Sequence, residues 1–218
     1  MESRNQNSTS DLIPPHGGYR KLKSFQIAQL VYDVTVRFCE LYIDWRSRTH
    51  DQMVQAARSG VQNIAEGSQA SGTSKKTELK LTNVARASLE ELRLDYEDFL
   101  RQRGLTLWKP DYPALVRFKA RQCSSLEDMR DWIEEEKRNK DRHKLTWTNT
   151  DKASVKVSES QWVSVGSSVL AANAALSLLN LCCYLLDRQL DAQAKAFEQK
   201  GGFTERLYKK RTQARKQQ

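Results

Sequence analysis

Residues 169–190 read VLAANAALSLLNLCCYLLDRQL, and this stretch decides the fold class of the chain. Apolar side chains recur there at steps of three and four, which is the repeat of an α-helix. Two apolar stripes are separated by a polar stripe. The first comprises Val169, Ala172, Leu176, Leu179, Cys183, Leu186 and Leu190, the second Leu170, Ala174, Leu178, Leu181 and Leu185, and the polar stripe Asn173, Ser177, Asn180, Tyr184, Asp187 and Asp191. A helix with two apolar faces has to bury both, so we expect one face to close a bundle and the other to meet the insert described below or another subunit.

The helix that contains this stretch is predicted to span residues 159–200. Ser158 and Gln161 have the spacing of a capping box, and Gly201-Gly202 stops the helix. Residues 160–186 carry no charge and are numerous enough to cross a bilayer. However, the polar residues gather on one stripe, as in a soluble bundle, so we expect no membrane span.

Three further helices precede this one. The first is predicted over 19–48, with Trp45 among its inward residues, and the second begins with Thr49 as N-cap, in a capping box with Gln52, and ends at Gly67 as C-cap. The third follows Thr73 or Ser74 and ends at Gly104. Short connections favour antiparallel neighbours. The sequence therefore predicts an all-α, antiparallel up-and-down four-helix bundle, with a partly helical insert between the third and fourth helices.

The chain is expected to have five parts. These are a flexible leader (1–18), bundle helices one to three (19–104), the insert with short helices and a linker (105–158), the fourth bundle helix (159–200) and a basic suffix tail (201–218).

The insert contains a short apolar piece over 115–118 and then a charged helix. That helix is predicted to start at a Ser124–Glu127 capping box, to turn Leu126, Met129 and Ile133 inward and to leave the charged run 134–138 in solvent. Residues 145–157 are predicted to be a linker with a short hairpin.

The amino-acid composition limits the classes of function that this chain can have. Of the 218 residues, 36 are Lys or Arg and 27 are Asp or Glu, which gives a net charge of +9. The four cysteines include no C-x-x-C pair and the three histidines are isolated, so we expect no metal site and no cofactor. The chain shows no phosphate-cradling loop and no nucleophile elbow, which argues against an enzyme. The N-terminal residues lack the apolar core of a secretory signal, which predicts a cytoplasmic location.

Basic residues carry the functional signal. The predicted nucleic-acid-binding residues are Arg46, Arg48, Arg58, Lys75, Lys76, Lys80, Arg86, Arg93, Lys209, Lys210, Arg211, Arg215 and Lys216. Arg46 and Arg48 are expected at the end of the first helix, beside Arg58. The alternative is that these cations are solvated and internally paired, because Arg86 and Arg93 each precede a glutamate by four residues.

The tail is the clearest case, because residues 200–218 hold seven basic residues and one acidic residue, 7 − 1 = +6. A basic, mobile tail is typical of a phosphate-binding arm, although solubility or attraction to anionic membranes also explains it. Tyr208 would either stack on a base or, with Phe203 and Leu207, dock the tail on the bundle.

The stretch 52–67, QMVQAARSGVQNIAEG, together with ASLEEL at 87–92, resembles the bacterial four-helix-bundle family encoded in intervening sequences of large-subunit rRNA genes. The same fold occurs in accessory variability proteins of diversity-generating retroelements, and the length of this chain resembles the subgroup with a C-terminal suffix. The resemblance implies a ring-like homopentamer, a basic surface that binds RNA or DNA, a reverse-transcriptase partner in retroelement systems and no catalytic activity.

The motif residues Gln52, Ser59, Asn63, Glu66, Gly67 and Ser88 are predicted to be structural. Asn63 and Glu66 are expected in the last turn of the second helix, where they can hydrogen-bond helix ends or backbone groups. The function predicted from the sequence is thus nucleic-acid binding without catalysis. The alternative is a protein-interaction scaffold that uses the insert and the suffix, with the charge incidental.

Overall fold

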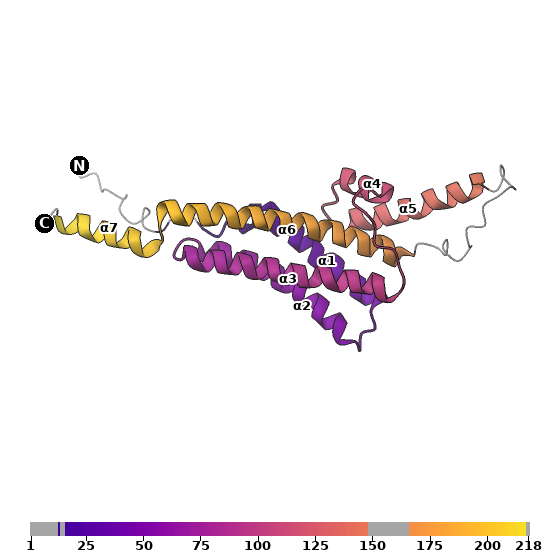
Figure 1. Cartoon of the computed structure of the whole chain (residues 1–218), viewed down its shortest axis with the longest axis horizontal. Helices are drawn as coiled ribbons and strands as arrows, with labels where there is room; N and C mark the ends of the chain where they lie inside the picture. The colour runs from indigo at the N-terminus through magenta and orange to yellow at the C-terminus, as the bar shows by residue number, and fades with distance from the viewer. Residues whose placement is uncertain (1–12, 14–15, 148–165, 217–218) are drawn as a thin grey trace, which may run out of the picture. The chain divides into compact units, whose positions relative to one another are not determined.

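The structure is a computed structural model that describes residues 13, 16–147 and 166–216, and the regular elements of these residues are all helices (Figure 1). The all-α prediction is therefore confirmed. The elements are a 3-10 helix η1 (Tyr19–Lys21) and the α-helices α1 (Lys23–Tyr42), α2 (Arg48–Ala70), α3 (Lys75–Gln102), α4 (Pro113–Arg121), α5 (Leu126–Trp147), α6 (Ser167–Lys200) and α7 (Phe203–Lys216).

The chain divides into two compact units. Unit 1 comprises Met1–Gln29, Ala56–Glu91 and Leu181–Gln218, and unit 2 comprises Leu30–Gln55 and Leu92–Asn180.

In unit 1, glycines let α2 and α3 approach closely. A Cβ atom at Gly60 would lie 2.6 Å from Cδ2 of Leu89, and one at Gly67 would lie 3.3 Å from the backbone oxygen of Glu78. From Gly60 to Gly67 the chain advances along α2, while the contacted residue on α3 goes back from Leu89 to Glu78. The two segments therefore run antiparallel. The predicted C-cap role of Gly67 is wrong: α2 continues to Ala70, and Gly67 is instead where the two helices touch.

Helix α6 also runs antiparallel to α3 in unit 1. Arg86 of α3 donates to Asp187, and the Gln193 side-chain amide donates to Glu78 at 3.2 Å. The start of α1 joins the same unit, because the Ser24 hydroxyl donates to the Gln189 side chain at 3.0 Å.

The core of unit 2 is aromatic. The Phe38 ring of α1 lies 4.8 Å, centroid to centroid, from both Tyr96 and Phe99 of α3. The buried Tyr96 hydroxyl donates to Thr35 Oγ1 at 3.1 Å, and Thr35 in turn donates to the Val31 carbonyl. The tyrosine hydroxyl is thus buried together with its acceptor, which removes the cost of leaving it unpaired.

The insert folds against itself and against α6 within unit 2. Arg117 of α4 makes two 2.7 Å hydrogen bonds to Glu136 of α5, and the rings of Phe118 and Trp132 lie 4.8 Å apart. Glu136 is only 3% exposed, so the prediction that the 134–138 run is simply solvated is wrong at this position. The cause is Arg117, which supplies the paired charge that lets the carboxylate be buried.

Asn173, on the polar stripe of α6, is hydrogen-bonded to the start of the insert. It is 1% exposed, its side-chain oxygen accepts from the Trp108 backbone N–H at 2.8 Å, and its amide donates to the Thr106 carbonyl at 3.0 Å. Residues 169–176 are all buried. The expected polar stripe is therefore buried at Asn173, where the Trp108 backbone N–H and the Thr106 carbonyl of the insert bond to this side chain.

Several helix ends differ from the prediction. Helix α1 stops at Tyr42, because the Asp44 side chain accepts from the Arg46 backbone N–H at 2.9 Å and forms a turn. Trp45, expected on the inward face, is 73% exposed. The N-cap of α2 is Ser47, whose hydroxyl accepts from the Thr49 backbone N–H at 3.2 Å, so the Thr49–Gln52 capping box is wrong.

The α5 cap is shifted by one residue. Ser125 Oγ accepts from the Asp128 N–H at 3.1 Å and the Asp128 carboxylate accepts from the Ser125 N–H at 3.0 Å, which forms a reciprocal cap in place of the predicted Ser124–Glu127 box. Met129 is buried as expected, whereas Leu126 is 37% exposed.

Other predicted ends are confirmed. Ser74 caps α3, Gly104 follows it at φ +62°, and Gly201 follows α6 at φ +64°. Helix α6 begins at Ser167, after the non-helical Gly166, rather than near residue 159. The predicted Ser158–Gln161 cap and most of the predicted 145–157 linker fall outside the described residues, although 145–147 belong to α5.

One described helical stretch, Ser167–Lys216, is long and apolar enough to cross a membrane, and 72% of its most apolar window is buried inside the protein.

Candidate nucleic-acid interface

The net charge is concentrated in unit 1. Unit 1 contains 18 Lys and Arg against 10 Asp and Glu, whereas unit 2 contains 18 against 17. Unit 1 therefore carries 18 − 10 = +8 of the total of +9. A polyanion attracted by the net charge would be attracted to unit 1.

The basic suffix, predicted from the sequence as a mobile tail, forms a helix over most of its length. Helix α7 starts after Gly202, whose backbone N–H donates to the Glu205 carboxylate at 2.7 Å. Phe203, Arg206, Leu207 and Lys210 recur at helical spacing and are half-buried, so they form the packed face. This periodicity was available in the sequence.

The other side of α7 is open to solvent. Tyr208 is 71% exposed. Its exposed cations are Lys209, Arg211, Arg215 and Lys216. None of these four makes an ion pair within the described part of the chain. Of the two roles considered for the tail aromatics, Phe203 and Leu207 take the docking role and Tyr208 does not.

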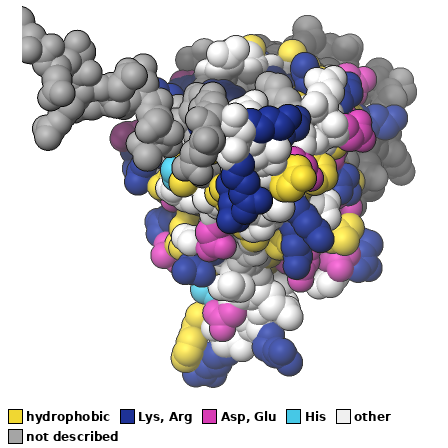
Figure 2. All heavy atoms as spheres, turned by 90° about the vertical axis from the view of Figure 1, so that its left-hand side faces the viewer, with side chains coloured by type: hydrophobic (Ala, Val, Ile, Leu, Met, Phe, Trp, Pro, Cys, Tyr) yellow, Lys and Arg dark blue, Asp and Glu magenta, His cyan; other side chains and the backbone are white. Residues whose placement is uncertain are grey.

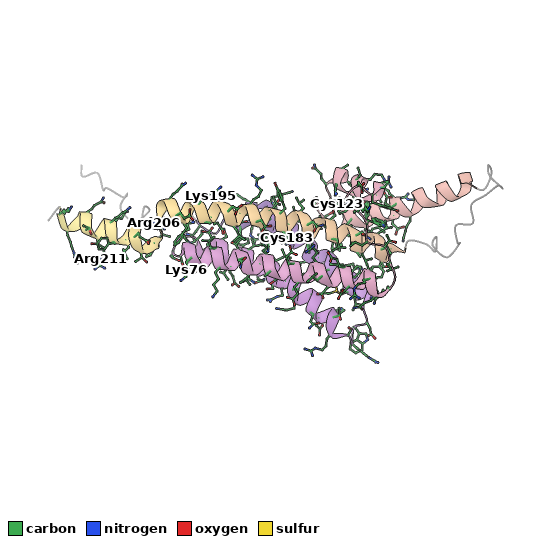
Figure 3. All side chains as sticks on the ribbon, in the orientation of Figure 1. Lys76, Cys123, Cys183, Lys195, Arg206 and Arg211 are labelled. Carbon is green, nitrogen blue, oxygen red and sulfur yellow. The ribbon has the colours of Figure 1, made fainter. Side chains whose placement is uncertain are left out.

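Arg206 lies in the first turn of α7 (Figure 3). It is half-buried, and its Nε and Nη2 atoms make no hydrogen bond to the described residues. The sequence analysis counted this residue only toward the charge of the tail.

The start of α3 contributes fewer unpaired cations than predicted. Lys75 donates to Glu78 at 2.8 Å, whereas Lys76 and Lys80 are exposed and have no ion pair among the described residues. Lys195 of α6 is also exposed (Figure 3). The helical spacing of the sequence places Lys195 on the helix face opposite the core, so its exposure could have been predicted, but it was not included among the predicted binding residues.

Two arginines of α3 are paired. Arg86 meets Asp187 of α6, a partner on another helix that the sequence did not predict, and Arg93 meets Glu97 at 3.3 Å, as the four-residue spacing predicted. The internally paired alternative is therefore supported for Lys75, Arg86 and Arg93.

The predicted group of Arg46, Arg48 and Arg58 is divided between the two units. Arg46 lies in the connection after α1, 5.1 Å from the centroid of the Trp45 ring, and Arg48 is the first residue of α2. Both belong to unit 2, whereas Arg58 is an exposed residue of α2 in unit 1. The prediction that the first two end helix one is wrong, because the Asp44 turn ends that helix earlier.

On the face that Figure 2 shows, Lys and Arg side chains are interspersed with Asp and Glu side chains. Helix α7, with six basic residues and one acidic residue, has the largest excess of cations among the described helices.

The motif at 52–67 is structural at its centre. The Ser59 and Ser88 hydroxyls lie 2.9 Å apart between α2 and α3, and the Asn63 amide donates to the Ser59 carbonyl at 2.9 Å. Gln52 and Glu66 are exposed and make no hydrogen bond to the described residues, so no hydrogen bond supports a structural role for them.

The structure also shows where the cysteines lie and whether residues that bind metals gather. Cys39 and Cys182 are fully buried, and Cys183 is 5% exposed. Burial raises the pKa of the Cys39 thiol to about 12 and also raises the pKa of Cys182. The described residues hold no group of three His, Cys, Asp or Glu side chains placed for a metal ion.

Comparison with known protein families, with curated proteins and with solved structures finds no match. The family membership expected from the sequence motif stays a prediction.

Proposed function

We propose that this chain is a non-enzymatic nucleic-acid-binding accessory protein that acts through a basic surface on an oligomeric helical bundle. The observation that carries the proposal is the exposed side of α7, where Lys209, Arg211, Arg215 and Lys216 have no ion pair among the described residues. Unpaired cations on one side of a helix neutralise phosphates without first breaking an internal contact.

The proposed architecture is an antiparallel four-helix bundle of α1, α2, α3 and α6, with α4 and α5 as the insert. The antiparallel contacts of α2 with α3, and of α3 with α6, support it. The proposal includes the family expected from the motif, a cytoplasmic location, a homo-oligomer that is a pentamer by resemblance, and a reverse-transcriptase partner in a retroelement setting. Leu181 of α6, which is 45% exposed, is suited to a subunit contact.

The test of binding is fluorescence anisotropy of labelled RNA and DNA, titrated with the full chain across a salt series from about 50 to 200 mM. We expect the logarithm of the affinity to fall linearly with the logarithm of the salt concentration. Four phosphate contacts give a slope of about −3 on single strands and about −4 on duplex DNA. An affinity that does not change with salt refutes the proposal.

A charge-matched pair of variants locates the surface. Replacing Lys209, Arg211, Arg215 and Lys216 with alanine removes four charges and favours the helix, because alanine has the highest helix propensity. The control replaces four exposed basic residues of unit 2, Arg101, Lys109, Arg130 and Arg138. We expect the α7 variant to lose most of the affinity and of the salt dependence, and the control to keep both.

The oligomer is tested separately by size-exclusion chromatography with light scattering. A ring predicts a mass several times that of the 25.1 kDa chain. A clean monomer removes the oligomer from the proposal.

A second candidate function, an interaction scaffold, is favoured by apolar exposure in the insert. Leu107 is 54% exposed and Val116 is 51% exposed, and both lie in unit 2. This function predicts no nucleic-acid binding even at low salt. It also predicts that Leu107→Ser with Val116→Ser prevents assembly with the protein partner while helix content by circular dichroism is unchanged.

A further inference from the structure

Tyr208 is the exposed aromatic residue of α7, and arginines surround it. At about 100° per residue, Arg211 lies about 60° and Arg215 about 20° from Tyr208 around the helix, so the three share one stripe. Tyr208 is 71% exposed and makes no hydrogen bond to the described residues. An aromatic ring held in water is a surface on which a flat partner can stack.

A second tyrosine of unit 1 has surroundings of mixed charge. Tyr184 of α6 is 55% exposed, and the Arg188 guanidinium lies 5.9 Å from the centroid of its ring and donates to its hydroxyl at 3.5 Å. Acids occupy the positions three and seven residues after Tyr184, Asp187 and Asp191, whereas arginines occupy those two positions after Tyr208. The surroundings of Tyr208 therefore carry the larger excess of positive charge, which attracts a phosphate-bearing partner.

We infer that the ligand of α7 is a single-stranded nucleic acid, with a base stacked on Tyr208 and the adjoining phosphates on Arg211 and Arg215; this inference rests on the proposed function. Bases in a duplex are already stacked on one another, whereas those of a single strand are free to stack on a protein ring. Along the helix, Tyr208 and Arg211 are about 4.5 Å apart and Arg211 and Arg215 about 6 Å apart.

The arrangement of α7 argues against an anionic membrane as the ligand. A helix that lies on a membrane presents its apolar residues to the lipid. In α7 the apolar Phe203 and Leu207 are half-buried on the packed face, whereas the Tyr208 side carries charge. That side is suited to a polyanion with flat, stackable groups.

The test measures binding of the full chain to one labelled oligonucleotide, both as a single strand and annealed into a duplex. The variants are Tyr208→Ala, Tyr208→Phe and, as the matched control, Tyr184→Ala. We expect tighter binding to the single strand. Tyr208→Ala should weaken binding to the single strand about 5- to 100-fold, the range for one stacked base, and should leave duplex binding unchanged. Tyr208→Phe keeps the ring, so it should bind like the unaltered chain, as should Tyr184→Ala.

The double variant Arg211→Ala/Arg215→Ala separates charge from stacking. Removing two phosphate contacts should lower the salt slope on the single strand by about 1.4. The control Arg130→Ala/Arg138→Ala, with two exposed arginines of unit 2, should leave the slope unchanged.

Three outcomes overturn the inference in distinguishable ways. If Tyr208→Ala has no effect, or weakens single strand and duplex equally, the stacking inference fails while salt-dependent binding still supports the proposed function. If neither oligonucleotide binds at about 50 mM salt, the proposed function fails as well. If phosphatidylserine vesicles bind the chain and single-stranded oligonucleotides do not compete, α7 is a membrane-surface element.

Discussion

The Arg117–Glu136 pair predicts unequal effects from removing its two members. Both partners contribute to the same pair of 2.7 Å hydrogen bonds, but the Arg117 side chain is 52% exposed and the Glu136 side chain only 3%. Removing Glu136 leaves an arginine that water can hydrate. Removing Arg117 leaves a buried carboxylate that water cannot reach.

The magnitudes follow from that difference in exposure. Arg117→Ala leaves an uncompensated buried charge and should lower the free energy of unfolding by about 3–5 kcal/mol. Glu136→Gln keeps the side-chain shape and one acceptor oxygen, so it should cost about 0.5–1.5 kcal/mol. Replacing both residues with methionine removes both charges, and such replacements are often neutral or stabilising, so this double variant should be clearly more stable than Arg117→Ala.

The assay is urea unfolding of the full chain, followed by circular dichroism and tryptophan fluorescence. Trp132 is a suitable reporter because it is 2% exposed and contacts Phe118 beside the pair. Equal losses for Arg117→Ala and Glu136→Gln, or a larger loss for the glutamine variant, would show that burial of the carboxylate does not determine the energy of this pair.

Three further outcomes are expected. Thr35→Val leaves the buried Tyr96 hydroxyl without its acceptor and should cost about 1–3 kcal/mol in urea unfolding, more than Tyr96→Phe, which removes the hydroxyl itself; equal costs would contradict the assigned bond. Hydrogen bonds from the backbone N–H of Ser124, and from neighbouring groups, lower the pKa of Asp128 below its ordinary value of 3.8. That stabilisation is present above pH 4 and is lost as the pH falls through the lowered pKa, so Asp128→Asn should be less stable than the unaltered chain at pH 7, and the difference in thermal melts should shrink as the pH is lowered below 4. Iodoacetamide at pH 8 should modify the half-exposed Cys123 before the three buried cysteines, as read by peptide mass spectrometry, and simultaneous modification of all four would show that the helices open readily.

The helices themselves were predictable from local patterns, but their ends were not. The three–four spacing that indicates α1 continues to Trp45, yet the Asp44 side chain turns the chain before that residue. Both Ser47 and Thr49 are acceptable N-caps by type, and the backbone path of the turn decides that Ser47 is used.

The candidate site was predictable as a charge but not as a surface. The excess of Lys and Arg in the suffix is visible in the sequence, and so is the helical spacing of Phe203 and Leu207. That Tyr208 lies outside while Leu207 lies on the packed face depends on what the rest of unit 1 offers α7 to pack against. Likewise, the pairing of Arg86 with Asp187 joins residues 101 positions apart, which no local rule predicts.

What the sequence determined by itself was the all-helical class, the glycine stops after α3 and α6 and the position of the excess charge, because each depends on neighbours within about one helical turn or on simple counting. The tertiary structure decided that Gly67 is a helix contact, that Glu136 is buried and that Asn173 holds the start of the insert. Each of these depends on a partner distant in sequence, and burial of a polar or small residue is stable only when that partner is in place.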